Sequence, residues 1–141
     1  MGAQGAGTVA ATIEAAGLID TDIVIDAARG IAEAIAFLAA QRTAAGLNVS
    51  IVSAMELVAG SRNKTELTQT QQFLQSFHVL PITASASQAA YQLMESFFLS
   101  HGLLIPDALI AATALEHGLS LHTKNTRHFQ MIPGLTIIRP Y

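Results

Sequence analysis

The sequence predicts an α/β fold with a central, mostly parallel sheet flanked by helices on both faces. Two observations lead to this prediction: short apolar, β-branched segments alternate with longer amphipathic ones, and glycine or proline separates them. The length of 141 residues is enough for one hydrophobic core and too short for two. We therefore expect a three-layer domain over residues 17–141, preceded by a flexible or partly ordered leader at residues 1–16.

The first half of the chain supplies two strand and helix pairs. Residues 17–20 are a short apolar run, and apolar residues then recur at helical spacing over residues 23–38, which predicts a strand followed by one helix. A second strand is expected over residues 47–52. The next helix is expected to begin at Ser53, because Ser53 and Glu56 have the spacing of a capping box.

The second half repeats this alternation. The predicted elements are helices over residues 67–77, 84–101 and 106–117, and strands over residues 78–82, 119–122 and 135–138. Gly102 suits the left-handed residue that closes a helix, and Pro106 suits the first position of the next one.

The composition indicates a folded chain without cysteine chemistry. Apolar residues make up 51% of the sequence and the formal net charge is only -3, which excludes a disordered chain. The absence of cysteine excludes disulfides, thiolate nucleophiles and cysteine-based metal sites. The beginning of the chain does not resemble a signal peptide and no segment resembles a membrane span, so we expect a cytoplasmic protein without membrane contact. The acidic balance means that any nucleic-acid role must depend on a local patch or on metal ions.

Three acids fall where predicted strands end or helices begin. Asp20 ends the first strand, Glu56 follows the second, and Asp107 opens a late helix. Because the carboxyl ends of parallel strands meet at one edge of a sheet, we expect these carboxylates to lie close together. Hard oxygen ligands select Mg²⁺ or Mn²⁺, and a divalent cation would offset the mutual repulsion of the carboxylates. The pattern therefore suggests phosphate-ester hydrolysis by a metal-activated water.

Each acid also has a purely structural interpretation. In a capping box, Glu56 would only satisfy a backbone N–H, and Asp107 would only complement the dipole of its helix. Asp20 or Asp22 would cap the helix that follows, and Asp26 is expected on its solvated face. The case for a metal site therefore depends on the joint placement of the acids.

Four segments resemble, in family order, the motifs of PIN-domain proteins, in particular the VapC toxins of bacterial toxin–antitoxin pairs. They are residues 18–30, 53–60, 105–114 and 123–129. The resemblance implies a PIN-like three-layer sandwich and an endoribonuclease that depends on Mg²⁺ or Mn²⁺ and cleaves RNA with a metal-activated water. It also implies a VapB-like antitoxin partner and a homodimer.

The resemblance also implies roles for particular residues. Asp20, Glu56 and Asp107 correspond to the catalytic, metal-binding carboxylates. The residues expected to support them are Thr21, Asp22, Thr123, Asn125 and His128. Family members commonly supply a further acid in the last motif, but this chain has no Asp or Glu after Glu116, and His128 stands where an Asp is often found. The number of metal ions is therefore open.

Basic residues are sparse but lie near two motifs. Arg62 and Lys64 follow the second motif, and Lys124 and Arg127 lie in the fourth. Our hypothesis is that they bind RNA phosphates without selecting a sequence. The alternative is that they are ordinary solvated charges.

Two other functions compete with a ribonuclease. Asp20 and Asp22 also match the D-x-D of haloacid-dehalogenase-like phosphatases, but the late acidic pair which that chemistry needs does not follow Lys124. The missing fourth acid instead raises the alternative of an inactive PIN module that binds RNA or a protein partner. Metal-dependent cleavage of RNA separates these possibilities.

Overall fold

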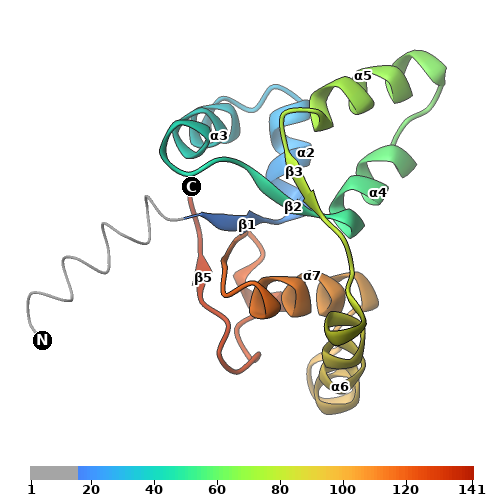
Figure 1. Ribbon diagram of the computed structural model, residues 1–141, viewed down its shortest axis with the longest axis vertical. Coiled ribbons are helices and arrows are strands. Elements are labelled where there is room, and N and C mark those ends of the chain that lie inside the picture. The colour runs from blue at the N-terminus through green and yellow to red at the C-terminus, as the bar shows by residue number, and fades with distance from the viewer. Residues whose placement is uncertain (1–15) are drawn as a thin grey trace, which may run out of the picture.

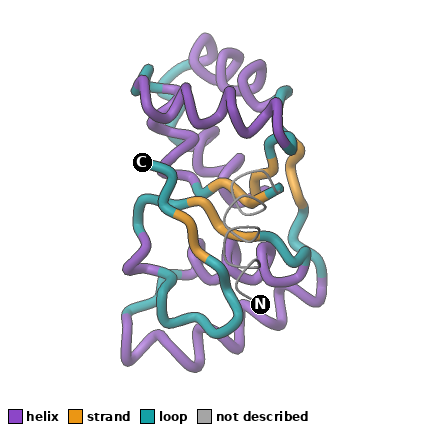
Figure 2. Tube along the Cα trace, turned by 90° about the vertical axis from the view of Figure 1, so that its left-hand side faces the viewer, coloured by secondary structure: helices purple, strands orange, loops and turns teal. Residues whose placement is uncertain are grey.

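A computed structural model describes residues 16–141, so the predicted leader, apart from its last residue, lies outside the described residues. Five strands form one parallel sheet in the order β3-β2-β1-β4-β5. The strands are β1 (Gly17–Ile19), β2 (Asn48–Ser50), β3 (His78–Leu80), β4 (Ser120–His122) and β5 (Ile137–Ile138). Figure 2 shows them as a central layer with helices on both sides.

Helices cover both faces of this sheet. The helices are α2 (Thr21–Ala28), α3 (Ala32–Ala44), α4 (Ile51–Ala59), α5 (Lys64–Leu74), α6 (Ala84–His101), α7 (Ile105–Glu116) and the 3-10 helix η1 (Thr126–His128). In Figure 1, α6 and α7 lie on one side of the sheet and α2, α3 and α5 on the other, while α4 contacts α2, α5 and α7. The predicted three-layer α/β architecture is confirmed. No helix within residues 16–141 is both long and apolar enough to cross a membrane.

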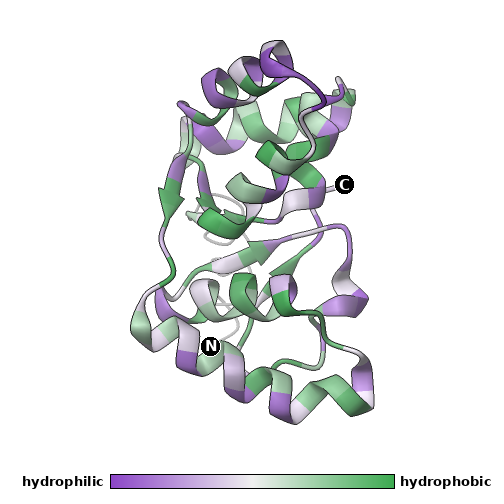
Figure 3. Ribbon diagram, turned by 90° about the vertical axis from the view of Figure 1, so that its right-hand side faces the viewer, coloured by the Kyte–Doolittle hydropathy of each residue, from purple (hydrophilic) through white to green (hydrophobic). Residues whose placement is uncertain are grey.

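The alternation of side chains along β1 divides the core in two. Leu18 packs with residues of α6 and α7, whereas Ile19 packs with Val49 and Ile23 on the opposite face of the sheet. Leu18 and Ile19 are fully buried, as expected for a strand covered on both sides. The outermost helix, α6, alternates between hydrophobic and hydrophilic residues in Figure 3, because only one of its faces contacts the core.

Two sequence predictions in the first half are wrong. The single helix expected over residues 23–38 is broken into α2 and α3, because Gly30 adopts a left-handed conformation with φ of 84°. The helix expected to begin at Ser53 begins at Ile51, because the Ser50 hydroxyl caps it by accepting the N–H of Val52 at 3.0 Å. Glu56 is therefore not the acid of a capping box.

From residue 84 onward the structure follows the sequence prediction closely, whereas the helix expected over residues 67–77 spans Lys64–Leu74 and the strand expected over residues 78–82 ends at Leu80. The helix predicted over residues 84–101 has those bounds, and Gly102 closes it with φ of 68°. The next helix begins at Ile105 with Pro106 in its first turn and ends at Glu116. The final strands are shorter than predicted at their first residues.

We expect Gly17→Ala to destabilise the fold. An added Cβ at Gly17 would overlap the imidazole of His122, which is 1% exposed and packs against Phe37 with the ring centres 5.0 Å apart. Because the buried ring has no space to move into, the free energy of unfolding should fall by about 1–3 kcal/mol in urea denaturation. Gly60→Ala is the matched control, since φ is −78° there and the nearest atom to an added Cβ lies at 3.4 Å. Equal stability of the two variants would contradict this packing.

Candidate active site

Asp20 is held at the carboxyl end of β1 by two threonines. It caps α2, where its Oδ1 accepts the N–H of Thr21 at 2.8 Å. Its Oδ2 accepts the hydroxyl of Thr123 at 2.7 Å, and Thr123 directly follows β4, the parallel neighbour of β1. Asp20 is only 4% exposed. The capping role considered from the sequence is thus real, and it fixes the carboxylate at the sheet edge where we expected the site.

Glu56 reaches the same point from the second turn of α4. Its Oε1 accepts the hydroxyl of Thr21 at 2.8 Å, and this hydroxyl also lies 2.7 Å from that of Ser53. A hydroxyl has one proton, so Thr21 donates to Glu56 and accepts from Ser53. Thr21 therefore orients Asp20 with its main chain and Glu56 with its side chain. Sequence reasoning missed this contact of Ser53, which needs the packing of α4 on α2.

Asp107 lies in the first turn of α7. Helix α7 covers the face of the sheet opposite to the one that α2 covers. Its Oδ2 is 3.3 Å from Nδ1 of His128 in η1. Burial raises the pKa of Asp107; the nearby His128 opposes this rise, and the carboxylate of Glu56 adds to it. Asp107 and Glu56 thus share one electrostatic environment, although they come from different motifs.

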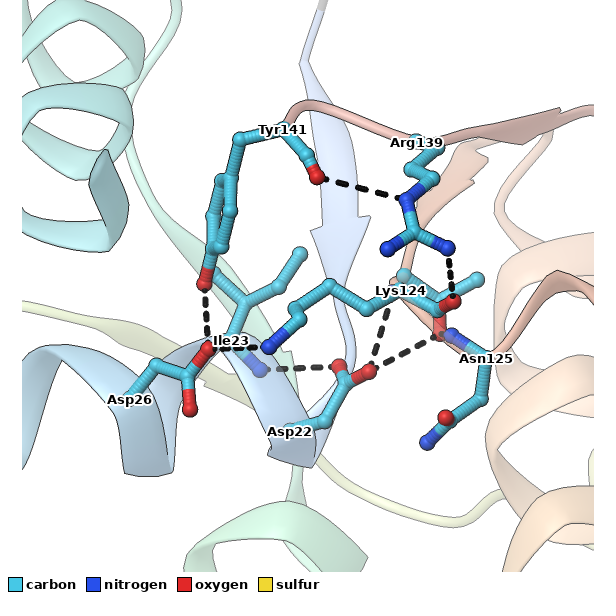
Figure 4. Close-up of polar contacts among 8 residues, drawn as sticks. Asp22, Ile23, Asp26, Lys124, Asn125, Arg139 and Tyr141 are labelled. Atoms are coloured by element: carbon cyan, nitrogen blue, oxygen red, sulfur yellow. Dashed lines mark hydrogen bonds and ion pairs between the residues drawn. The ribbon is translucent and has the colours of Figure 1, made fainter. Parts of the chain in front are cut away.

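Asp22 binds the loop that follows β4 (Figure 4). Its Oδ1 accepts the N–H of Ile23 at 2.8 Å, and its Oδ2 accepts the N–H of Lys124 at 2.9 Å and the Thr123 hydroxyl at 3.5 Å. Protein donors therefore occupy much of its bonding capacity. Asn125 contributes its N–H to Thr123 Oγ1 at 2.9 Å, while its side chain is exposed.

The four basic candidates differ in their surroundings. Arg62 is 84% exposed and pairs with Glu66 at 2.8 Å, while Lys64 and Arg127 are exposed. Arg62 and Glu56 both line a groove of about 790 Å³ between α2, α4 and α5. The fourth candidate, Lys124, instead places its ammonium 2.7 Å from a carboxylate of α2.

That carboxylate belongs to Asp26, and the sequence interpretation of Asp26 as a solvated residue is wrong. Its side chain is only 18% exposed, and its Oδ2 accepts hydrogen bonds from Lys124 Nζ at 2.7 Å and from the Tyr141 hydroxyl at 2.8 Å. These bonds keep the pKa of Asp26 below its usual value. No local pattern could reveal this role, because Tyr141 lies at the far end of the sequence.

Asp20 is the most strongly perturbed acid of the cluster. Burial, and then the carboxylates of Asp22 and Asp107, raise its pKa to about 7, although the bonds from Thr123 and Thr21 oppose the rise. A proton or a cation at this position is therefore favourable near neutral pH.

The residues present fit a hard divalent cation. Within residues 16–141, no three His, Asp or Glu side chains converge closely enough to surround an ion as they stand. However, Glu56 Oε2 and Asp107 Oδ1 accept no hydrogen bond from the described residues, so each of these carboxylates has one oxygen open to a metal ion. Carboxylate oxygens are the ligands that suit Mg²⁺ or Mn²⁺, so Asp20, Glu56 and Asp107 are the residues that would hold such an ion.

Comparisons with known proteins agree with this geometry. A family model described as the PIN domain matches residues 17–134. The chain is 36% identical over 119 residues to Ribonuclease VapC10 of Mycobacterium tuberculosis, covering 84% of this chain and 89% of that protein. Ribonuclease VapC19 of the same organism is 36% identical over 121 residues, covering 84% of this chain and 95% of that protein. A toxin-antitoxin complex from Klebsiella pneumoniae superposes with a TM-score of 0.74 at 32% identity, covering 89% of this chain and 98% of that chain.

These matches define the class of protein first: the chain belongs to the PIN-domain family. Within that family it groups with the VapC ribonucleases. Structures of lower identity, such as a VapBC2 complex from Rickettsia felis at 23% identity and a TM-score of 0.72, share the fold. The family and fold expected from the four motifs are therefore confirmed.

We expect the metal-free protein to lose stability as the pH rises, because of Asp20. With a folded-state pKa of about 7 against an ordinary value of 3.8, its contribution to stability is complete below pH 3.8 and is lost as the pH rises through 7. The loss should be roughly 2–4 kcal/mol. Burial lowers the pKa of His122 to about 4, which acts oppositely by removing stability as the pH falls below 6.5.

The measurement is therefore a difference between two proteins. Urea unfolding of the wild type and of Asp20→Asn at pH 5 and pH 8, both with chelator, cancels the effect of His122. The wild type should lose stability relative to the variant between these two values. Because Mn²⁺ competes with the proton on Asp20, it should bind more tightly at pH 8 than at pH 6. Parallel stability curves would contradict the perturbed state of Asp20.

Proposed function

We propose that this PIN-domain ribonuclease hydrolyses RNA at a divalent-cation site formed by Asp20, Glu56 and Asp107. The observation that carries the proposal is the link made by Thr21, whose N–H binds Asp20 and whose hydroxyl binds Glu56. The electrostatic coupling of Asp107 to both acids supports including it. Three carboxylates remote in sequence thus form one acidic site.

Mg²⁺ or Mn²⁺, when bound by these carboxylates, would activate water and stabilise charge on the phosphoryl oxygens. The chain's own residues have separate tasks. Thr21 and Thr123 hold the buried Asp20 with its two oxygens fixed. Glu56 is exposed and keeps Oε2 open, so it is the carboxylate able to take a proton from the attacking water. His128 holds Asp107 in place of a further acid, which favours one cation over two.

The protein acts as the toxin of a pair with a VapB-like antitoxin, in the cytoplasm where its RNA substrate lies. We also propose a homodimer. Leu99, Leu104 and Ile105 are 95%, 56% and 64% exposed around the junction of α6 and α7. An apolar surface of this kind suits a second copy of the chain.

The two competing functions stand differently. A phosphatase would need Asp22 as a free acid or base, but the main-chain N–H groups of Ile23 and Lys124 each bind one of its carboxylate oxygens. An inactive PIN module would have the same fold and the same antitoxin partner but would not cleave RNA. Measurements of RNA cleavage therefore distinguish it from the ribonuclease.

We expect Asp20→Asn, Asp107→Asn and Glu56→Gln each to lower kcat/KM for RNA cleavage by at least about 100-fold, because each removes a charged ligand or base. Cleavage in Mn²⁺ should stop on chelation and return on metal addition. Glu95→Gln is the matched control, because Glu95 is an exposed acid of α6. Cleavage of RNA by Asp20→Asn, or by the wild type in chelator, would contradict the proposal.

We expect Arg62 and Arg127 to contribute RNA affinity through phosphates. In the Asp20→Asn background, Arg62→Gln and Arg127→Gln should weaken binding equally for unrelated sequences and lower the salt slope by about 1 each. Lys64→Gln tests the exposed neighbour at the start of α5, and Arg42→Gln is the control on α3. Slopes identical to that of the control would identify these residues as ordinary solvated charges.

A further inference from the structure

Two side chains from the end of the sequence bind one carboxylate oxygen of α2 beside the acidic site. Asp26 Oδ2 accepts one hydrogen bond from the ammonium of Lys124 at 2.7 Å and another from the hydroxyl of Tyr141 at 2.8 Å (Figure 4). The ammonium also lies 5.4 Å from the centre of the Tyr141 ring, within range of a cation–π interaction. We call these three residues the Asp26 clasp.

Arg139 links the main chains of two clasp residues, Lys124 and Tyr141. The guanidinium of Arg139 donates to the carbonyl oxygen of Lys124 at 2.9 Å and to that of Tyr141 at 3.2 Å. On its other side, the N–H of Lys124 donates to Asp22 Oδ2 at 2.9 Å. Lys124 is thus held through its ammonium, its carbonyl oxygen and its N–H.

Helix α2 presents both acids that hold this residue. Asp22 and Asp26 are one helical turn apart and lie on the same face of α2. Asp22 binds the main chain of Lys124 and Asp26 binds its side chain. Together they fix the loop of residues 123–125 against α2.

The position of this loop determines how Asp20 is held. Thr123 donates its hydroxyl to Asp20 Oδ2 at 2.7 Å. The N–H of Asn125 donates to that hydroxyl oxygen at 2.9 Å, which leaves the hydroxyl proton directed at Asp20. A shift of the loop would therefore misdirect the donor that orients the buried carboxylate.

We propose that the Asp26 clasp is a positioning unit for the acidic site: Asp26, Lys124 and Tyr141 hold the 123–125 loop so that Thr123 presents Asp20 to the cation. This role rests on the proposed function. It assigns Lys124 to positioning instead of to RNA phosphates, because its ammonium is already bound by Asp26 and covered by Tyr141. Partners that orient metal ligands in this way commonly matter for metal affinity as well as for activity.

The test compares metal binding with RNA binding. The variants are Asp26→Asn, Lys124→Gln and Tyr141→Phe, the last of which removes one hydroxyl and keeps the ring. We expect Mn²⁺ affinity, measured by calorimetry or electron paramagnetic resonance, to fall about 10-fold in Asp26→Asn and about 3-fold in Tyr141→Phe. RNA affinity in chelator and its salt slope should be unchanged in all three, because none of these residues contacts phosphate in this proposal.

A double-mutant cycle tests whether the clasp acts as a unit. Asp26→Asn with Lys124→Gln should weaken Mn²⁺ binding no more than the stronger single variant, because both changes release the same loop. Glu33→Gln is the matched control: Glu33 lies near enough to influence Tyr141 but makes no side-chain hydrogen bond to a described residue. It should bind Mn²⁺ like the wild type.

Each contrary outcome has a distinct meaning. Unchanged Mn²⁺ affinity in folded Asp26→Asn and in Tyr141→Phe overturns the positioning role while the proposed function stands. A lower salt slope in Lys124→Gln overturns it as well, because the lysine then binds RNA. If the wild type itself neither binds Mn²⁺ nor cleaves RNA, the proposed function fails and the positioning role fails with it.

Discussion

The burial of the Asp20 carboxylate is the constraint on which the rest of the site depends. An ionised carboxylate that is 4% exposed loses most of its hydration, and the two hydrogen bonds from Thr21 and Thr123 replace only part of it. The neighbouring carboxylates increase the cost further. A cation at this edge of the sheet would remove the repulsion and satisfy the remaining oxygen lone pairs. The fold thus creates a local deficit of positive charge that a divalent ion can fill.

The sheet produces this deficit through its register. β1 and β4 pair in parallel with Ile19 opposite His122, so the next residues, Asp20 and Thr123, leave the sheet side by side. The close approach of His122 to Gly17 belongs to the same pairing, since any larger residue at the start of β1 would meet the imidazole. The packing of His122 against Gly17 at the start of β1 therefore supports the positions of Asp20 and Thr123 at the carboxyl ends of the two strands.

The sequence was sufficient for the parts of the fold and site that depend on local patterns. Strand ends followed by acids predicted the sheet edge, and strong helix formers followed by Gly102 predicted α6 with its observed bounds. The break at Gly30 was missed because apolar spacing continues across it, and the Ser50 cap was missed because Ser53 offers an equally plausible local pattern. The clasp could not be predicted, because it joins α2 to residues near the end of the sequence, and only tertiary contacts reveal such a pairing.

The clasp also affects the charge of the site. Lys124 follows Thr123 directly, so its ammonium is attached to the loop whose threonine binds Asp20. If that ammonium turned toward the acids, it would offset part of their charge and compete with a divalent ion. The hydrogen bond to Asp26 Oδ2, which also accepts one from Tyr141, holds the ammonium against α2, while the N–H of Lys124 donates to Asp22. The same residue therefore stabilises the loop through its N–H while its ammonium is paired with Asp26.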